Sequence, residues 1–511
     1  MLSIVKSMAL HGLEGYLINV QIDISSGLPY WQIVGLPDAT VKESKERVRT
    51  AIKNSGFEFP SRKIIINLAP ANTKKEGSIL DLPIAVGILI ATEKVFCKNI
   101  EEYAFIGELS LDGKLNKING ILPMCIEAVN LGIKNIIVPK ENAKEASIVK
   151  QLNIIPVETL GQVINYLNGE INIENEKIDI DKLFNETNKY STDFSEVKGQ
   201  ENIKRALEIA AAGGHNCILI GSPGSGKTML ARRLPTILPD LTFKEALEVT
   251  KIHSIAGILK NDTPIITTRP FRAPHHTISA ISLVGGGKTP KPGEISLAHF
   301  GVLFLDELTE FNKSTLEVLR GPLEDREITI SRVNASLTYP CNFVLIASMN
   351  PCPCGYFGSK DKECICSPQA ISRYIGKISG PLLDRIDIHI EVEAVKYKKL
   401  EQKEQIESSS SIKERVNKAR QIQLNRYKEA NIFSNSELTP KLLEKYCKLD
   451  SKSNLLLENV FNKLKLSARA YGRIIKVART IADLDNKENI EEKHIAEAIQ
   501  YRSLDRKYWN N

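Results

Sequence analysis

The chain has 511 residues, of which 42% are hydrophobic, 25% are charged and 6% are aromatic. These proportions are typical of globular proteins and exclude a chain that is disordered throughout. At roughly 150 residues per domain, the length predicts about three domains. The net charge of +7 is small for this length. It is compatible with nucleic-acid binding but is no evidence for it.

Apolar runs and cysteines indicate the compartment. The longest apolar run, residues 83–92, is about half as long as a membrane crossing requires. The first six residues lack the basic-then-apolar layout of a secretory signal. The nine cysteines are an odd number, and four of them fall within residues 352–366, which argues against a secreted disulfide framework. We therefore expect a cytoplasmic protein with reduced thiols and no membrane partner.

The first part of the chain, residues 1–170, mixes strand and helix patterns. Residues 63–67 and 135–139 predict buried strands. Residues 41–53 predict an amphipathic helix with Val41, Val48 and Ile52 on one face. Residues 171–192 are rich in Asn, Glu, Lys and Asp, and predict a solvated linker.

The rest of the chain divides into an α/β part and a helical part. Short apolar runs separated by helical patterns occupy residues 193–394, whereas residues 395–511 show no strong strand signal. Four serines at residues 408–411 predict a small loop. Helices are expected at residues 401–429, 438–449, 453–466, 468–484 and 491–502.

A glycine-rich loop follows the apolar residues 217–220. It reads GSPGSGKT and leads into a helical pattern, which is the strand–loop–helix context of a P-loop. Glycines let backbone N–H groups converge on phosphate oxygens, the lysine neutralises phosphate charge, and the threonine hydroxyl ligates Mg²⁺. The predicted nucleotide-binding residues are Gly221, Ser222, Pro223, Gly224, Ser225, Gly226, Lys227 and Thr228.

Two later strand ends supply polar side chains for the same site. Asp306 and Glu307 follow the apolar residues 302–305. Asp306 is expected to hold Mg²⁺ through water, and Glu307 to act as the general base that polarises the attacking water. Asn350 ends the next apolar strand, where its amide can orient that water.

Three arginines are candidates for contact with the γ-phosphate. Arg385 is placed to reach the nucleotide of a neighbouring subunit, and Arg469, in preference to Arg473, is expected to act from a helical lid. A surface salt bridge is the alternative for each. This ordered set resembles the AAA+ ATPases, with Walker A, Walker B, sensor 1, arginine finger and sensor 2. By the same resemblance, Val197 and Ile203 are expected to contact adenine.

The 79 residues between the P-loop lysine and Asp306 predict an insertion, and residues 267–299 are the candidate. Its stretch of Gly, Pro and Lys predicts an exposed loop. Residues 328–331 and 335–339 predict a β-hairpin. The two loops resemble those with which the pre-sensor-1 hairpin branch of AAA+ proteins grips DNA in the pore of a ring. The resemblance implies DNA contact, for which Lys288, Lys291 and Arg332 are the candidate phosphate-binding residues, although subunit contacts are an alternative. For His275 and His276, packing or hydrogen bonding is expected rather than a metal site.

Four cysteines form two C-x-C pairs on a short segment. Four thiolates are sufficient for a tetrahedral structural Zn²⁺ site, although one intervening residue in each pair is fewer than usual. A reduced loop without metal is the alternative. The candidate ligands are Cys352, Cys354, Cys364 and Cys366.

Residues 74–83 and 113–124 resemble the Lon-type protease fold. The positions of the catalytic serine and lysine fall on Ile79 and Leu122, and Ser78 is one residue out of place. Neither isoleucine nor leucine can act as nucleophile or base. A degenerate, non-proteolytic domain for docking or assembly is therefore expected.

The whole chain resembles the YifB/ComM family of magnesium-chelatase-like AAA+ ATPases, on the segments PFRAPHHT, GEISLAHFGVLFLDEL and MNPCPCG. The resemblance implies an α/β AAA+ core with a parallel sheet, an N-terminal α+β Lon-like domain and an all-α C-terminal lid. It also implies a hexameric ring that uses ATP and Mg²⁺ to migrate branched or single-stranded DNA, with recombination proteins as partners. The alternative function is a chelatase-type ATPase that remodels a protein partner.

Overall fold

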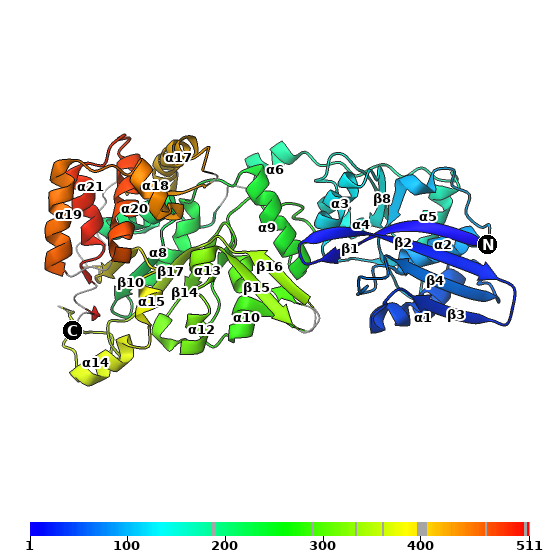
Figure 1. Ribbon diagram of the computed structural model, residues 1–511, viewed down its shortest axis with the longest axis horizontal. Coiled ribbons are helices and arrows are strands. Elements are labelled where there is room, and N and C mark those ends of the chain that lie inside the picture. The colour runs from blue at the N-terminus through cyan, green and yellow to red at the C-terminus, as the bar shows by residue number, and fades with distance from the viewer. Residues whose placement is uncertain are drawn as a thin grey trace. The chain divides into compact units, whose positions relative to one another are not determined.

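The computed structural model describes residues 1–186, 190–287, 290–332, 335–359, 362–395, 406–430, 432–464, 468–504 and 508–509 (Figure 1). It contains two compact units. Unit 1 comprises Met1–Glu186 and Ala246–Ile266, and unit 2 comprises Thr187–Glu245 and Thr267–Asn511. Within the described ranges, every helix is too short or too polar to cross a membrane.

Unit 1 is built on a seven-stranded mixed sheet with the order β3-β4-β2-β1-β5-β8-β9. Strands β1, β2 and β4 pair antiparallel, and the outer strands pair parallel. The predicted strands at 63–67 and 135–139 are confirmed as β4 and β8. The strands are β1 (Leu2–His11), β2 (Glu14–Ser25), β3 (Tyr30–Val34), β4 (Lys63–Ala69), β5 (Tyr103–Phe105), β8 (Asn135–Pro139) and β9 (Asn153–Val157), with β6 (Glu108–Leu109) and β7 (Leu115–Asn116) as a separate pair.

Six helices accompany this sheet. The predicted amphipathic helix is confirmed as α1, because Val41, Val48 and Ile52 are all buried. The segment expected to be a solvated linker instead contains a short helix, α6, whose Ile180 is buried. The helices are α1 (Ala39–Asn54), α2 (Asp81–Ala91), α3 (Ile121–Asn130), α4 (Lys140–Ala146), α5 (Leu160–Leu167) and α6 (Ile180–Glu186).

Unit 1 also includes residues from the middle of the chain. Most of α9 (Phe243–Ala256) packs there, although the expected α/β core of 193–394 contains this helix. Ser254 donates a hydrogen bond to the buried Glu145, and its hydroxyl accepts one from the backbone of Gly120 at 3.0 Å. Burial raises the pKa of Glu145 to about 7. Buried polar contacts of this kind cannot be read from the spacing of apolar residues, which is why the expected boundary differs.

Unit 2 contains a five-stranded, all-parallel sheet with the order β11-β14-β17-β10-β18. The runs expected to be strands at 217–220 and 302–305 are confirmed as β10 and β14. All carboxyl ends of a parallel sheet share one edge, so residues that follow these strands are brought together. The strands are β10 (Cys217–Gly221), β11 (Phe271–Arg272), β14 (Val302–Leu305), β17 (Val344–Met349) and β18 (Ile388–Val392).

Helices surround this sheet and continue into the C-terminal part. One hydrophobic core includes Ala210 of α7 together with Ile474 and Ala478 of α20, so the lid helices share the core of the sheet (Figure 1). The helices are α7 (Glu201–Gly213), α8 (Lys227–Arg233), α12 (Lys313–Glu317), α13 (Pro322–Asp325), α14 (Pro368–Ile375), α15 (Gly380–Leu383), α17 (Ser409–Arg426), α18 (Pro440–Tyr446), α19 (Ser451–Leu464), α20 (Ala468–Leu484) and α21 (Glu492–Gln500).

Two local expectations need correction. The serines do not form a separate loop: Ser408 caps α17, accepting a hydrogen bond from the backbone of Ser411 at 3.3 Å, as N-cap serines do. The Gly/Pro/Lys stretch is not simply an exposed loop, because β12 (Gly285–Gly286) pairs with β13 (Lys291–Pro292) and Gly285 is buried. A Cβ on Gly285 would lie 2.4 Å from the carbonyl oxygen of Lys291, so the close pairing requires glycine.

The insertion also contains α10 (Ala280–Val284) and α11 (Glu294–Leu297). The predicted hairpin is confirmed: β15 (Glu327–Arg332) pairs antiparallel with β16 (Ala335–Pro340).

Candidate active site

The P-loop lies between the carboxyl end of β10 and the start of α8. Gly224 and Gly226 have φ angles of 77° and 91°, a left-handed conformation that glycine adopts at no steric cost. The loop therefore turns sharply enough for its backbone N–H groups and the first turn of α8 to face one point. This is the arrangement that binds the phosphates of a nucleotide.

Lys227 connects the loop to the next strand of the sheet. Its ammonium donates to the backbone oxygens of Gly221 at 2.7 Å and Ser222 at 2.9 Å, and to Oδ1 of Asn350 at 3.2 Å. Burial lowers the pKa of Lys227, and the negative charges of Asp306 and Glu307 oppose that effect. A bound triphosphate would add negative charge beside this ammonium.

The predicted Mg²⁺ ligands lie in direct contact. The hydroxyl of Thr228 donates to Oδ2 of Asp306 at 2.7 Å, and Ser348 on β17 donates to the other carboxylate oxygen. A hydroxyl and a carboxylate are oxygen ligands that Mg²⁺ prefers beside nucleotide phosphates. The donor set therefore fits the ion.

Glu307 lies near His276, a contact that the sequence did not predict. It adopts φ 53°, and Nδ1 of His276 lies 3.7 Å from its Oε2. His276 lies four residues after β11, which pairs with β14, and Asp306 directly follows β14. The position of His276 shortly after the segment that forms β11 is the one signal in the sequence that could have indicated this contact. The contact depends on the pairing of β11 with β14, and the pairing of two such short strands cannot be derived from the sequence. His275 hydrogen-bonds with Thr277 at 2.9 Å.

Arg385 and Arg469 lie at the opposite edge of the sheet. Both line a cavity of about 520 Å³ that also includes Asn216, Phe343 and Asp387, the residues that immediately precede β10, β17 and β18. The five residues of β10 separate this edge from the P-loop by roughly 13 Å. The structure therefore brings Lys227, Thr228, Asp306, Glu307 and Asn350 together but does not bring the two arginines to them.

Each arginine is paired with a carboxylate in the isolated chain. Arg385 donates to Glu324 and, at 2.8 Å, to the backbone oxygen of Pro381. Arg469 is 63% exposed and lies 3.8 Å from Asp384. Arg469 is thus the freer cation of the two, whereas Arg385 is largely buried.

The residues predicted to contact adenine lie inside the protein. Val197 and Ile203 belong to the hydrophobic core of unit 2 and are almost fully buried. Nearby, the amide of Gln200 donates to the backbone oxygens of Ser225 in the P-loop and Glu393 after β18, at 2.9 and 3.2 Å. This side chain ties the segment that precedes α7 to the P-loop.

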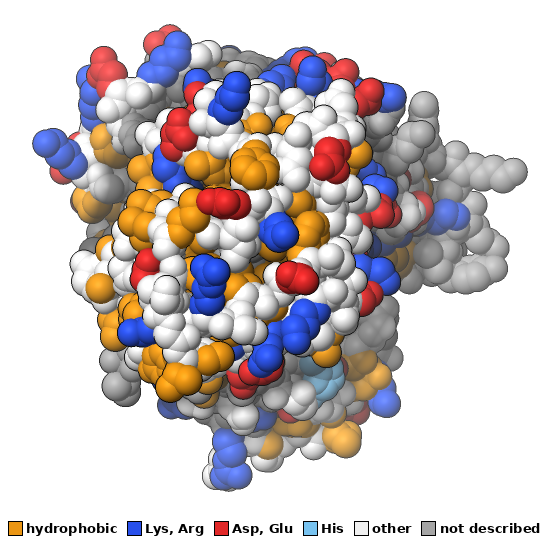
Figure 2. All heavy atoms as spheres, turned by 90° about the vertical axis from the view of Figure 1, so that its right-hand side faces the viewer, with side chains coloured by type: hydrophobic (Ala, Val, Ile, Leu, Met, Phe, Trp, Pro, Cys, Tyr) orange, Lys and Arg blue, Asp and Glu red, His pale blue; other side chains and the backbone are white. Residues whose placement is uncertain are grey.

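The predicted DNA-contacting residues lie in or beside the two hairpins. Lys291 is exposed on β13, Arg332 ends β15, and Lys288 lies outside the described residues, as does the side chain of Arg332. On the described part of the unit 1 face in Figure 2, basic and acidic side chains alternate and form no continuous patch of one sign. That face therefore offers no candidate DNA-binding surface in addition to the two hairpins.

The four cysteines form a compact cluster. The sulfur of Cys352 lies 3.3 Å from that of Cys354 and 3.7 Å from that of Cys364, and all four sulfurs, including that of Cys366, are within 4.8 Å of one another. Zn–S bonds of about 2.3 Å place tetrahedral sulfurs roughly 3.8 Å apart, so the geometry fits zinc. In the described ranges, this is the one group of His, Cys, Asp and Glu side chains with such an arrangement.

The Lon-like positions in unit 1 hold no catalytic pair. Ile79 is half-buried and Leu122 is fully buried, while Ser78 donates to Glu108. Lys75 is fully buried, and its ammonium donates to backbone oxygens, including that of Thr73 at 2.7 Å.

The parallel sheet, P-loop and acidic strand end define a P-loop protein of the AAA+ class. Family models match in order along the chain: "Subunit ChlI of Mg-chelatase" at residues 20–142, "Magnesium chelatase, subunit ChlI" at 193–400, and "Magnesium chelatase, subunit ChlI C-terminal" at 406–502. The chain is 44% identical to competence protein ComM of Haemophilus influenzae, over 98% of both chains. It is 44% identical to YifB of Escherichia coli, over 99% of this chain and 98% of YifB.

The chain therefore belongs to the YifB/ComM family of magnesium-chelatase-like AAA+ ATPases. A more distant similarity is to the magnesium-chelatase 38 kDa subunit of Rhodobacter capsulatus, which is 24% identical over 40% of this chain and 59% of that subunit. The predicted fold class is confirmed: an α/β AAA+ core with a parallel sheet, a Lon-like N-terminal unit and a helical C-terminal part.

Proposed function

We propose that this chain is an ATP-hydrolysing ring motor that acts on DNA. The observation that carries the proposal is the division of the catalytic residues between two edges of one sheet. Lys227 and Asp306 lie at the carboxyl edge, and Arg385 lies at the amino edge. One subunit would thus supply the triphosphate site, and the next would supply the arginine that completes it. This requires copies in head-to-tail contact, and closure of such contacts gives a ring in which every site is complete.

At the carboxyl edge, each residue has a defined task. Lys227 binds the β- and γ-phosphates, and Thr228 and Asp306 hold Mg²⁺, which neutralises phosphate charge when bound. Glu307 accepts the proton of the attacking water, and Asn350 orients that water. The contact between Lys227 and Asn350 at 3.2 Å supports this arrangement, because it places the amide beside the cation that binds the γ-phosphate.

At the amino edge, Arg385 and Arg469 would face the nucleotide of a neighbouring copy. Arg385 would exchange Glu324 for a phosphate oxygen, and Arg469 needs to leave only a 3.8 Å contact with Asp384. A guanidinium at this place stabilises the charge of the transition state. A homo-hexamer is the assembly that the family resemblance implies. The proposed domains of each copy are residues 1–170, 171–192, 193–394 and 395–511, with residues 246–266 of the third packed in unit 1.

DNA is the proposed substrate of the motor. The relative from H. influenzae is named a competence protein, which fits a motor that moves incoming DNA. Lys291 on the short β12–β13 hairpin and Arg332 on the β15–β16 hairpin would contact phosphates. The second candidate function, remodelling of a protein partner, is favoured by the chelatase family models and the 24% similarity to a chelatase subunit.

Branched DNA provides the test. We expect a Holliday junction to stimulate ATP hydrolysis and to bind in a salt-dependent manner. The Lys291→Ala variant should reduce the slope of log affinity against log salt by about 0.9, the contribution of one phosphate contact. Lys418→Ala is the matched control, because this exposed lysine on α17 lies outside the two hairpins and pairs with Glu414, one turn away on the same helix. Absence of both stimulation and salt-sensitive binding would reject DNA in favour of a protein partner.

The four cysteines are proposed to hold structural Zn²⁺. Besides the sulfur distances, backbone N–H groups of Cys354 and Phe357 point at the sulfurs of Cys366 and Cys352, at 3.4 and 3.3 Å. Such contacts stabilise thiolate ligands of a metal. The same segment touches the P-loop, because a Cβ on Gly355 would lie 2.5 Å from Cδ of Pro223.

Elemental analysis of the chain purified under reducing conditions should give one zinc per chain. We expect Cys364→Ser to lose this zinc and to bind ATP more weakly, since the cysteine segment supports the P-loop. Cys97→Ser, which alters a free thiol of unit 1, should change neither property. A metal-free chain with full ATP affinity would contradict the proposal.

A further inference from the structure

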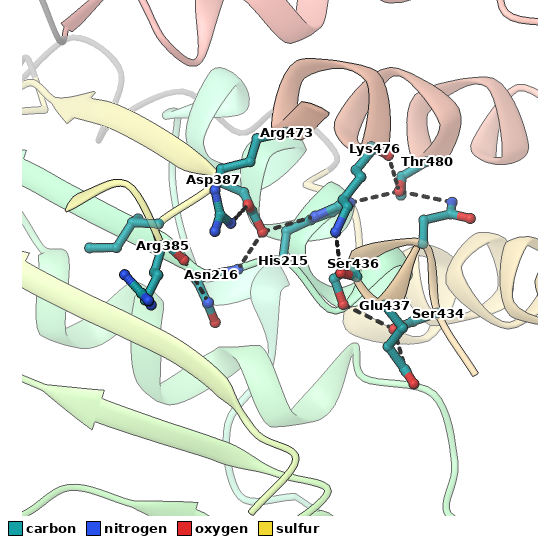
Figure 3. Close-up of polar contacts among 12 residues, drawn as sticks. His215, Asn216, Arg385, Asp387, Ser434, Ser436, Glu437, Arg473, Lys476 and Thr480 are labelled. Carbon is teal, nitrogen blue, oxygen red and sulfur yellow. Dashed lines mark hydrogen bonds and ion pairs between the residues drawn. The ribbon is translucent and has the colours of Figure 1, made fainter. Parts of the chain in front are cut away.

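Asn216 fixes the turn that carries Arg385 to the amino edge of the sheet. Its side-chain amide donates to the backbone oxygen of Arg385 at 2.9 Å, and its Oδ1 accepts from the backbone of Leu345 on β17 at 2.8 Å. Its own backbone oxygen accepts from Asp387 at 3.0 Å. The backbone at Arg385 is therefore held by Asn216 (Figure 3), which precedes β10 and is itself bonded to β17.

Asp387, two residues after Arg385, joins this turn to the lid. One carboxylate oxygen accepts from Arg473 of α20, and the other lies 3.2 Å from Nδ1 of His215. The side chain is 3% exposed. Burial alone would raise the pKa of Asp387, but the charge of Arg473 and the hydrogen bond from His215 hold it well below its usual range. The buried carboxylate is thus charged and bound on both sides (Figure 3).

The lid side of this cluster is one stripe of α20. Arg469, Arg473, Lys476 and Thr480 are spaced four, three and four residues apart, so they share one face of the helix. Thr480 Oγ1 lies 2.7 Å from Nε2 of His215, on the side of the ring opposite to Asp387. Arg473, in the second turn of α20, is therefore attached directly to Asp387, and Thr480, in the fourth turn, is attached to it through His215.

The contact between α7 and α20 leaves no room for a side chain at Gly213. A Cβ on Gly213, the last residue of α7, would lie 2.3 Å from Nε2 of His215 and 2.4 Å from Oγ1 of Thr480. No side chain fits there without displacing one of the two, so this glycine permits the close approach of α7 and α20.

We propose that Asp387, with Arg473 and His215, acts as a positioning latch for catalysis in trans. The latch holds Arg385 and the first turn of α20, which carries Arg469, as one rigid edge that meets the neighbouring nucleotide. Arg473 itself contacts no phosphate, because its guanidinium is bound to the buried carboxylate of Asp387. The inference rests on the proposed function, since it assigns residues that position the arginine finger.

The test measures kcat and KM of the assembled protein for Asp387→Asn and Arg473→Gln. Misplacing a catalytic group by about 1 Å costs roughly 100-fold in rate, so we expect kcat to fall on that order while KM and ATP affinity stay unchanged. Arg473→Lys should recover part of the loss. Arg426→Gln is the matched control: it breaks the ion pair with buried Asp483 in the same helical part, so it should lower thermal stability without the fall in kcat.

Assemblies that mix two variants distinguish a misplaced Arg385 from a chain that does not fold. An Asp387→Asn chain has an intact P-loop, so copies of Glu307→Gln, which keep a correctly held Arg385, should restore its hydrolysis when mixed with it. Thr480→Val removes the hydroxyl that contacts His215, the side-chain amide of Asn435 and the backbone oxygen of Lys476. It leaves the pair of Asp387 with Arg473 in place, so it should show a smaller fall in kcat, and it provides the measurement if Asp387→Asn does not fold.

Three outcomes are decisive. Full activity of Arg385→Ala would remove the proposed trans site itself. A second outcome would overturn the latch alone: Arg385→Ala loses activity while Asp387→Asn keeps a normal kcat. If Asp387→Asn does not fold, a normal kcat of Thr480→Val has the same meaning. Failure of Glu307→Gln copies to restore a folded Asp387→Asn chain would overturn the latch in favour of a purely structural role.

Discussion

The Glu307→Gln variant is expected to bind ATP with Mg²⁺ as tightly as the parent chain but to hydrolyse it about 100 to 10,000 times more slowly. Glutamine keeps the shape of the side chain and removes the group that accepts the proton of the attacking water, and a general base contributes a factor of this order. Steady-state phosphate release gives the rate, and a fluorescent ATP analogue gives the affinity.

Lys227→Ala is the complementary variant. Its ammonium lies within the P-loop, where it contacts Gly221, Ser222 and Asn350, and it is the group expected to bind the γ-phosphate. Removal of this ammonium should abolish the binding of ATP, and not only its hydrolysis. Normal hydrolysis by Glu307→Gln would show that another group is the base, and His276, 3.7 Å from Glu307, would be the first to examine.

Arg385→Ala should reduce hydrolysis by the assembled protein about 1,000-fold or more, the contribution of an arginine finger. ATP affinity of each chain should change little, because Arg385 lies at the edge of the sheet opposite to the P-loop. Light scattering with ATP checks that the variant still assembles, since the variant also removes the ion pair with Glu324.

Mixed assemblies show whether Arg385 acts between subunits. Arg385→Ala chains keep the base, and Glu307→Gln chains keep the finger. A mixture should therefore contain interfaces with both groups and hydrolyse ATP faster than either variant alone. A mixture no more active than its components would place the action of Arg385 within its own chain, contrary to the separation of the two edges.

Much of the geometry of the candidate site could be predicted from the sequence because its parts are local. The P-loop is a continuous strand–loop–helix segment, and Asp306 and Asn350 follow apolar strands whose carboxyl ends meet in a parallel sheet. The hairpin of β15 and β16 followed from alternation and was confirmed. In each case, residues adjacent in sequence carry the information.

The parts that could not be predicted depend on contacts between distant segments. His276 reaches Glu307 through the pairing of β11 with β14. Asp387 joins residues 215 and 473, which are far apart in the chain. Ser254 packs against Glu145 in unit 1, although its place within residues 193–394 predicted that it belongs to the α/β core. The spacing of apolar residues in one sequence does not reveal contacts between residues that are far apart in the chain.

The separation of the P-loop from Arg385 on one sheet has a genetic consequence. In a cell that carries both a normal and an altered copy of the gene, a subunit without Arg385 would bind ATP and enter the ring, yet silence the site of a healthy neighbour. A subunit without Lys227 would silence only its own site. In the proposed ring, each altered subunit of either kind would remove one site, so the dominance of Arg385→Ala over the normal copy should grow with the coordination between sites.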